Sequence, residues 1–159
     1  MRKALLVGGL LGWPAVVGLS HEIPKAILDH DPRLVRLQEF FGQRDCPLRE
    51  AAADFLIAAD EYALDWRLLP SISIIESSGG KDYRNNNVFG WDSCRESFTS
   101  VREGIHFVAD QLANSKLYKD KNLDNKLSTY NPLPDYPRKV KAVMHALGKE
   151  AMPRIGSLN

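Results

Sequence analysis

"DWRLLPSISIIESSGG", residues 65–80, predicts a buried helix that carries one acid near its end. Asp65 can cap the helix, and Pro70 falls within the first turn, where a proline is tolerated. The residues that follow are almost wholly apolar up to Glu76, so we expect this helix to be buried all round. A glycine pair ends it and three asparagines follow at 85–87. A lone carboxyl group thus stands between an apolar helix and a polar loop.

Other helices are predicted on both sides of this segment from capping residues and apolar residues at helical spacing. They are expected over residues 31–42, 47–65, 99–115, part of 117–130, and 136–148. Between Gly79 and Ser97 neither the helical nor the strand period is present, and the glycine, asparagine and serine content favours a small irregular or hairpin lobe. The prediction is a mainly α fold with this lobe inserted between helices.

The chain has 159 residues, of which 44% are hydrophobic, enough for one core and hence one domain. Its 21 lysines and arginines nearly cancel its 20 aspartates and glutamates, so no strong field favours binding to nucleic acid or to anionic membranes. There is no CxxC pair and no Cys/His cluster, and the histidines are scattered. We therefore expect neither a metal nor another cofactor. The four histidines are His21, His30, His106 and His145.

The first twenty residues have the order of a secretory signal peptide, with a basic start, an apolar stretch and small residues before His21. An uncleaved membrane anchor and a buried N-terminal helix are the alternatives. Residues 21–30 read as a linker, 31–150 as the folded domain and 151–159 as a C-terminal tail. Export would place the protein in the periplasm or outside the cell, with no stable membrane insertion once the signal is cleaved.

An oxidising compartment would allow Cys46 and Cys94 to pair, which would link the early helices to the asparagine segment. Sequence alone does not show whether their Cα atoms come within bonding reach, so two free thiols are the alternative. The oligomeric state stays open.

Glu76 is the residue most suited to catalysis. A carboxyl group in apolar surroundings holds its proton more tightly, because its charged form loses hydration. It can then donate that proton to a leaving oxygen, as cleavage of a glycosidic bond requires. Downstream, "NNNVFGWD" combines amides with Phe89 and Trp91, and hydrogen-bonding groups beside flat apolar faces suit a sugar. The alternatives are a solvated helix end and an asparagine-rich turn packed on its aromatics.

The segments "LLPSISIIES", "NNNVFGW" and "STYNPLPDYPRKV" together resemble the lysozyme-like peptidoglycan hydrolases, chiefly bacterial N-acetylglucosaminidases and more loosely lytic transglycosylases, over roughly residues 48–147. The resemblance implies a lysozyme-like domain with Glu76 as catalytic acid and then base, and with Tyr130, six residues before Tyr136, facing it as a second catalytic residue. It also implies a single-acid route, in which the substrate's own N-acetyl or 6-hydroxyl group attacks while Tyr130 stabilises the developing charge or orients the sugar. The substrate-binding candidates are Ser77, Asn86, Asn87, Phe89, Gly90, Trp91, Asn131 and Tyr136, with Gly80 completing the glutamate motif.

Two departures leave the subfamily open. Leu133 precedes Pro134 where glucosaminidases tend to have an aspartate, and the "GLMQ"-like segment of the transglycosylases is absent. Hydrolysis by two carboxylates would need a second acid. The candidates for it are Asp82, Asp92 and Glu96.

The leading expectation is an exported enzyme that cleaves the β-1,4 bond between N-acetylglucosamine and N-acetylmuramic acid in the glycan strands of peptidoglycan. A lytic transglycosylase giving 1,6-anhydro products and a non-catalytic glycan-binding protein are the alternatives. A third alternative, a helical interaction protein with coincidental motifs, would leave Glu76 on an open surface, with no groove beside it and no contact between residues 85–91 and Tyr130.

Overall fold

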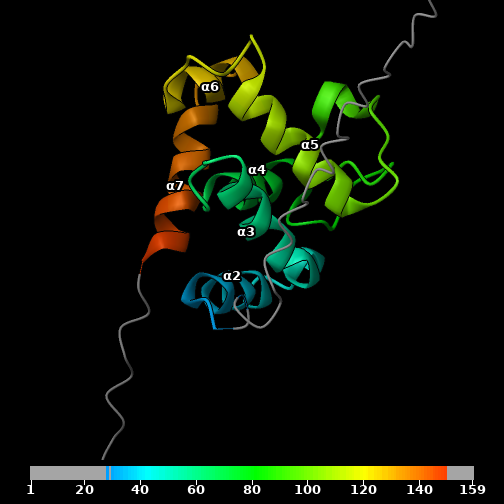
Figure 1. Ribbon diagram of the computed structural model, residues 1–159, viewed down its shortest axis with the longest axis vertical. Coiled ribbons are helices and arrows are strands. Elements are labelled where there is room, and N and C mark those ends of the chain that lie inside the picture. Colours follow the sequence, from blue (N-terminus) through cyan, green and yellow to red (C-terminus); the bar gives the residue numbers. More distant parts are fainter. Residues whose placement is uncertain (1–27, 29, 150–159) are drawn as a thin grey trace, which may run out of the picture.

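The computed structural model describes Leu28 and residues 30–149 (Figure 1). The predicted signal segment, the tail at 151–159 and most of the predicted linker lie outside the described residues. Over the described part, the chain forms six α-helices and two 3-10 helices and no strand, so the mainly α prediction is confirmed. None of these helices is both long enough and apolar enough to span a membrane.

The N-terminal helices follow their local sequence signals. Helix α2 (Pro32–Gly42) begins after Asp31, whose side chain accepts the amide of Arg33 at 2.8 Å, as a capping aspartate should. The helix predicted over 47–65 starts as a 3-10 turn, η1 (Pro47–Ala51), and continues as α3 (Ala52–Glu61).

Helix α4 (Leu68–Ser77) lies at the centre of the fold, between α7 on one side and α5 on the other (Figure 1). It packs chiefly against α7 (Tyr136–Gly148) and also against α3. The expected burial on all sides holds at its start, where residues 68–73 are buried, but residues 74–76 are only half-buried. The last turn of the central helix therefore opens toward a surface.

The glycine pair after α4 allows a close chain reversal. Ser78, Gly79 and Gly80 all have positive φ angles, of 53°, 70° and 85°. A Cβ on Gly79 would lie 2.3 Å from Sγ of Cys46, and one on Gly80 would lie 2.7 Å from Cγ of Leu48. Only glycine fits at these two positions, so the pair lets the chain leave α4 directly against η1.

The lobe between α4 and α5 is irregular, as predicted, but it contains no hairpin. Its described residues form one isolated bridge, between Arg84 and Asn87, and the short helix η2 (Trp91–Cys94). Five residues of the lobe other than glycine have positive φ angles, which explains why neither the helical nor the strand period was visible. They are Asn85, Asn86, Asp92, Ser93 and Cys94.

The C-terminal helices complete the core. Helix α5 (Val101–Asn114) is capped by Ser100, whose hydroxyl accepts a hydrogen bond from the backbone amide of Glu103. The carboxylate of Glu103 in turn accepts a hydrogen bond from the backbone amide of Thr99. Helix α6 (Leu123–Tyr130) is short, and a five-residue turn leads from it into α7. This turn brings the ends of α6 and α7 to the open last turn of α4.

The expected bridge between Cys46 and Cys94 is not formed, and both thiols are free. Cys46 is buried against Gly79, with its thiol directed at the carbonyl oxygens of Arg44 and Ser78. Cys94 instead belongs to η2, in the irregular lobe. The prediction was wrong because the glycine turn holds the Cys46 thiol on the η1 side.

Candidate active site

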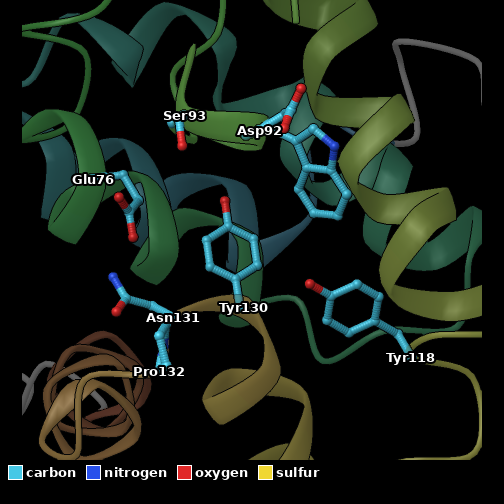
Figure 2. Close-up of a pocket in the computed structure, with 9 residues that line it drawn as sticks. Glu76, Asp92, Ser93, Tyr118, Tyr130, Asn131 and Pro132 are labelled. Carbon is cyan, nitrogen blue, oxygen red and sulfur yellow. The ribbon is translucent and has the colours of Figure 1, made fainter. Parts of the chain in front are cut away.

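A cavity of about 620 Å³ lies at the open end of α4, between the irregular lobe and the turn from α6 to α7 (Figure 2). That volume is in the range of small-molecule sites in proteins. Its walls come from four parts of the chain, which are brought together only by the tertiary fold. They are Glu76 of α4, the lobe residues Gly90, Trp91, Asp92 and Ser93, Tyr118 of the connector between α5 and α6, and Tyr130, Asn131 and Pro132 at the end of α6.

Glu76 is the only residue of α4 that lines this cavity. Its Oε1 accepts a hydrogen bond of 2.6 Å from the hydroxyl of Tyr136, and its Oε2 lies against Gly90, where an added Cβ would be 3.2 Å away. Burial raises the pKa of the Glu76 carboxyl, and the hydrogen bond from Tyr136 offsets part of that rise. Glu76 is thus a half-buried acid with one oxygen fixed and the other beside the cavity wall.

The two late tyrosines have different partners from those expected. The resemblance implied that Tyr130 faces the acid, and both do line the cavity, but the hydroxyl of Tyr130 donates to the carbonyl oxygen of Phe89 at 2.6 Å. Tyr136, expected to bind substrate, is 2% exposed and donates to Glu76. The two rings stack with centroids 5.9 Å apart and planes at 7°. Tyr136 therefore positions the acid, while Tyr130 ties the lobe to α6.

Burial sets the protonation of both phenols. It raises the pKa of Tyr136 far above its ordinary value, and the hydrogen bond to Glu76 adds to this rise. The pKa of Tyr130 is also raised well above normal, first by burial and then by the charge of Glu76. Both hydroxyls keep their protons and act as donors.

Besides Tyr136, four of the expected substrate-binding residues do not line the cavity. The amide of Asn87 is buried and bonds both the amide and the carbonyl of Trp91 and the carbonyl of Glu96, and that of Asn86 donates to the carbonyl of Phe98. The Ser77 hydroxyl donates to a backbone carbonyl within α4, and the Phe89 ring is fully buried in the core. These side chains build the lobe and the end of α4 through their own contacts and do not face the cavity.

Aromatic rings form the wall of the cavity opposite Glu76. Trp91, predicted for this role, packs against Tyr130 and Tyr118, with ring centroids 5.6 and 6.0 Å away. Gly90 and Asn131 also line the cavity as expected. Sequence reasoning missed Tyr118, although it is the single aromatic residue of the mostly polar segment "KLYKDKNLD". Flat rings beside a hydrogen-bonding acid suit the apolar faces of a sugar.

A turn of unusual conformation forms the rim between the aromatic wall and Glu76. Asp92, Ser93 and Cys94 have φ angles of 50°, 55° and 60°, three consecutive left-handed residues without a glycine among them. Each such residue costs about 1–2 kcal/mol relative to right-handed backbone. Asn87 holds both ends of this turn, through Trp91 before it and Glu96 after it. The surrounding lobe thus imposes a strained conformation at the edge of the cavity, where sequence gave no signal for Ser93.

Of the three acids considered as a second carboxylate, only Asp92 lines the cavity among the described residues. Its carboxylate pairs with the guanidinium of Arg95. In Figure 2, Asp92 and Glu76 lie on opposite sides of Tyr130. Asp82 and Glu96 are not among the lining residues. The described residues also contain no group of three or more side chains placed to hold a metal ion.

The fold and the cavity define a mainly α-helical protein with one half-buried acid in an aromatic pocket. Comparison with known proteins found no matching family model, no matching curated protein and no matching solved structure. The geometry speaks against the third alternative, since Glu76 lies in a cavity and Tyr130 contacts residue 89.

Proposed function

We propose that the protein is an exported glycosidase that cleaves the β-1,4 bond between N-acetylglucosamine and N-acetylmuramic acid in peptidoglycan, with Glu76 as general acid and then base. The observation that carries this proposal is the half-buried Glu76 carboxyl, with its raised pKa, in a cavity lined by aromatic rings. The proposed lysozyme-like fold and the exported location rest on the sequence resemblance and on the N-terminal signal pattern.

The hydrogen bond from Tyr136 determines which oxygen of Glu76 carries the proton. Because the hydroxyl of Tyr136 is a donor, Oε1 must act as the acceptor. The proton of the neutral acid then resides on Oε2, which lies beside Gly90 at the cavity wall. Donation from Oε2 to the bridging oxygen of a bound glycan breaks the glycosidic bond, and Tyr136 stabilises the carboxylate that remains.

The second half of the reaction needs a nucleophile. Asp92, the one other acid of the cavity wall among the described residues, is paired with Arg95, which argues against the route with two carboxylates. Single-acid chemistry therefore fits better. The substrate's own acetamido oxygen attacks the sugar carbon, and Glu76, now ionised, activates water to complete hydrolysis. The hydroxyl of Tyr130 is held by Phe89, so its part is limited to the cavity wall.

Attack by the substrate's 6-hydroxyl instead of water would make the protein a lytic transglycosylase. The same Glu76 serves both reactions, so the two candidates differ in product. Hydrolysis leaves a reducing sugar, whereas transglycosylation leaves a 1,6-anhydro ring two hydrogens and one oxygen lighter. Mass spectrometry of the soluble fragments released from purified cell walls distinguishes them.

The direct test is Glu76→Gln, which keeps the shape of the side chain and removes its acid proton. Glu96→Gln is the matched control, because it makes the same change in the lobe outside the cavity. We expect the first variant to lose clearing of purified walls while still sedimenting with them, and the second to clear normally. Clearing that survives Glu76→Gln would overturn the assignment, and wild-type protein that binds walls without clearing them would favour the glycan-binding alternative.

A further inference from the structure

The strained turn at Asp92–Cys94 brings a hydroxyl group to the cavity beside Glu76. Figure 2 shows the Ser93 side chain directed toward the space between Glu76 and Tyr130, with Asn131 on the other side of the Glu76 carboxyl group. Within the described part of the chain, Oγ of Ser93 makes no hydrogen bond, and Asn131 uses only its Oδ1, which accepts the amide of Leu133. Two polar groups that make no bond to the described protein, the Ser93 hydroxyl and the Asn131 Nδ2, thus flank the acid.

The conformation of the turn is what directs Ser93 into the cavity. Left-handed backbone turns a side chain to a different side than a right-handed or extended residue would. Serine has no special tolerance for this conformation, so a residue chosen for backbone fit alone would be glycine. Strained residues of this kind persist where the surroundings hold them, and they cluster at ligand sites. Here Asn87 is the group that holds both ends.

We propose that Ser93 is a substrate-positioning residue, whose hydroxyl hydrogen-bonds the sugar bound beside Glu76 while the Asn131 amide binds the same glycan from the opposite side. This inference rests on the proposed function, because it takes a glycan as the ligand. Ser93 takes no part in the proton transfer. It fixes the sugar so that the bridging oxygen meets Oε2 of Glu76.

Substituting glycine at position 93 distinguishes the effect of the Ser93 hydroxyl on activity from the effect of its strained backbone on stability. Ser93→Gly removes the hydroxyl but relaxes the left-handed residue, so the melting temperature should rise by about 2–4 °C. The kcat/KM for a soluble peptidoglycan glycan should nevertheless fall about five- to tenfold, the effect of one hydrogen bond. Ser93→Ala should give the same loss of activity without the gain in stability. A residue with a structural role alone would show activity that follows stability.

Ser97→Gly is the matched control, an exposed serine of the same lobe outside the cavity and with φ outside the positive range. Binding is measured separately, by calorimetry with a peptidoglycan tetrasaccharide, in Glu76→Gln and in the double variant that adds Ser93→Gly. We expect the double variant to bind about five- to tenfold more weakly.

The outcomes distinguish the two proposals. If walls are cleared only when Glu76 is present but Ser93→Gly acts and binds like Ser97→Gly, the role of Ser93 is overturned and the enzyme assignment stands. If the wild-type protein clears no walls but Ser93→Gly still weakens tetrasaccharide binding, the Ser93 inference holds and the enzymatic activity is overturned. If the protein neither clears walls nor binds the tetrasaccharide, both are overturned.

Discussion

Replacing Tyr136 by phenylalanine removes one hydroxyl from the candidate site and tests how Glu76 is held. The ring of Tyr136 is 2% exposed and stacks on Tyr130, so phenylalanine preserves the packing. What is lost is the 2.6 Å bond to Oε1 of Glu76. Such a bond contributes about 0.5–1.5 kcal/mol when the acid is neutral and about 1.5–3 kcal/mol when it is ionised.

Two results follow from that difference. At acidic pH, Glu76 is protonated in both proteins, and the variant loses the extra stabilisation that the bond gives the carboxyl group as its proton leaves. That difference is roughly 1 kcal/mol, so kcat/KM should fall by about three- to tenfold. Because the bond favours the carboxylate, its removal also raises the pKa of Glu76 further. The general acid then stays protonated to higher pH. We expect the basic limb of the profile of kcat/KM against pH to move to higher pH. The assay is wall clearing or cleavage of a soluble glycan.

Tyr130→Phe is the matched control, since it removes the same atom from the neighbouring stacked ring. Its hydroxyl bonds the carbonyl of Phe89, so its loss leaves a buried acceptor unpaired and should cost about 1–3 kcal/mol of stability. The basic limb should move less than in Tyr136→Phe, because the bond to Oε1 of Glu76 is kept. If Tyr130→Phe moved the limb and Tyr136→Phe did not, the assignment of the two tyrosines would be reversed and the expectation from the resemblance restored.

Further predictions concern stability, the cavity wall and the thiols. Burial raises the folded-state pKa of Glu76 above its ordinary 4.5, so stability is lost as pH rises through that folded value. Glu76→Gln should therefore have a higher melting temperature than wild type near pH 8 but not near pH 4. Equal melting temperatures at both pH values would contradict the burial of the Glu76 carboxyl group. Asn87→Ala removes the three hydrogen bonds of a buried side chain and should cost roughly 3 kcal/mol in denaturant unfolding; a loss under 1 kcal/mol would mean that Asn87 does not hold the turn. Gly90 has a φ of 61°, and Gly90→Ala places a Cβ 3.2 Å from Oε2 of Glu76, so both activity and melting temperature should fall. Unchanged activity would mean that Gly90 does not contact the catalytic oxygen. A thiol titration of protein denatured without reductant should find two free thiols, Cys46 and Cys94. A value of zero would show that the two cysteines form a disulfide bridge.

The helices were predictable because their signals are local. Asp31 and Ser100 cap the helices that follow them, and the apolar residues of α5 and α7 lie on one face at helical spacing. A cap acts on an amide two or three residues away, so the sequence contains both partners. The position of Glu76 was predictable for the same reason, since the apolar run and the glycine pair that enclose it are adjacent in the chain.

The partners of the polar side chains were not predictable in this way. An asparagine amide serves a sugar and a backbone equally well, and only the folded lobe shows that Asn86 and Asn87 bond the backbone. The left-handed turn that presents Ser93 contains no glycine and is held by the bonds of Asn87 within the folded lobe, so no residue type indicated it. Tyr118 reaches the cavity from a connector whose path depends on how α5 and α6 pack.

The stacked tyrosines connect these observations. Tyr130 is the last residue of α6 and Tyr136 the first of α7, and the turn between them sets the two rings face to face. The hydroxyl of Tyr130 donates to the carbonyl oxygen of Phe89 in the lobe, and the hydroxyl of Tyr136 donates to Glu76. A shift of the lobe would therefore be transmitted through the ring stack to the acid. Gly90 follows Phe89 directly and lies against Oε2, so the same movement would also change the space into which the proton is delivered. The geometry of the acid and the shape of the cavity wall are thus set by one set of contacts, and loosening either should disturb the other.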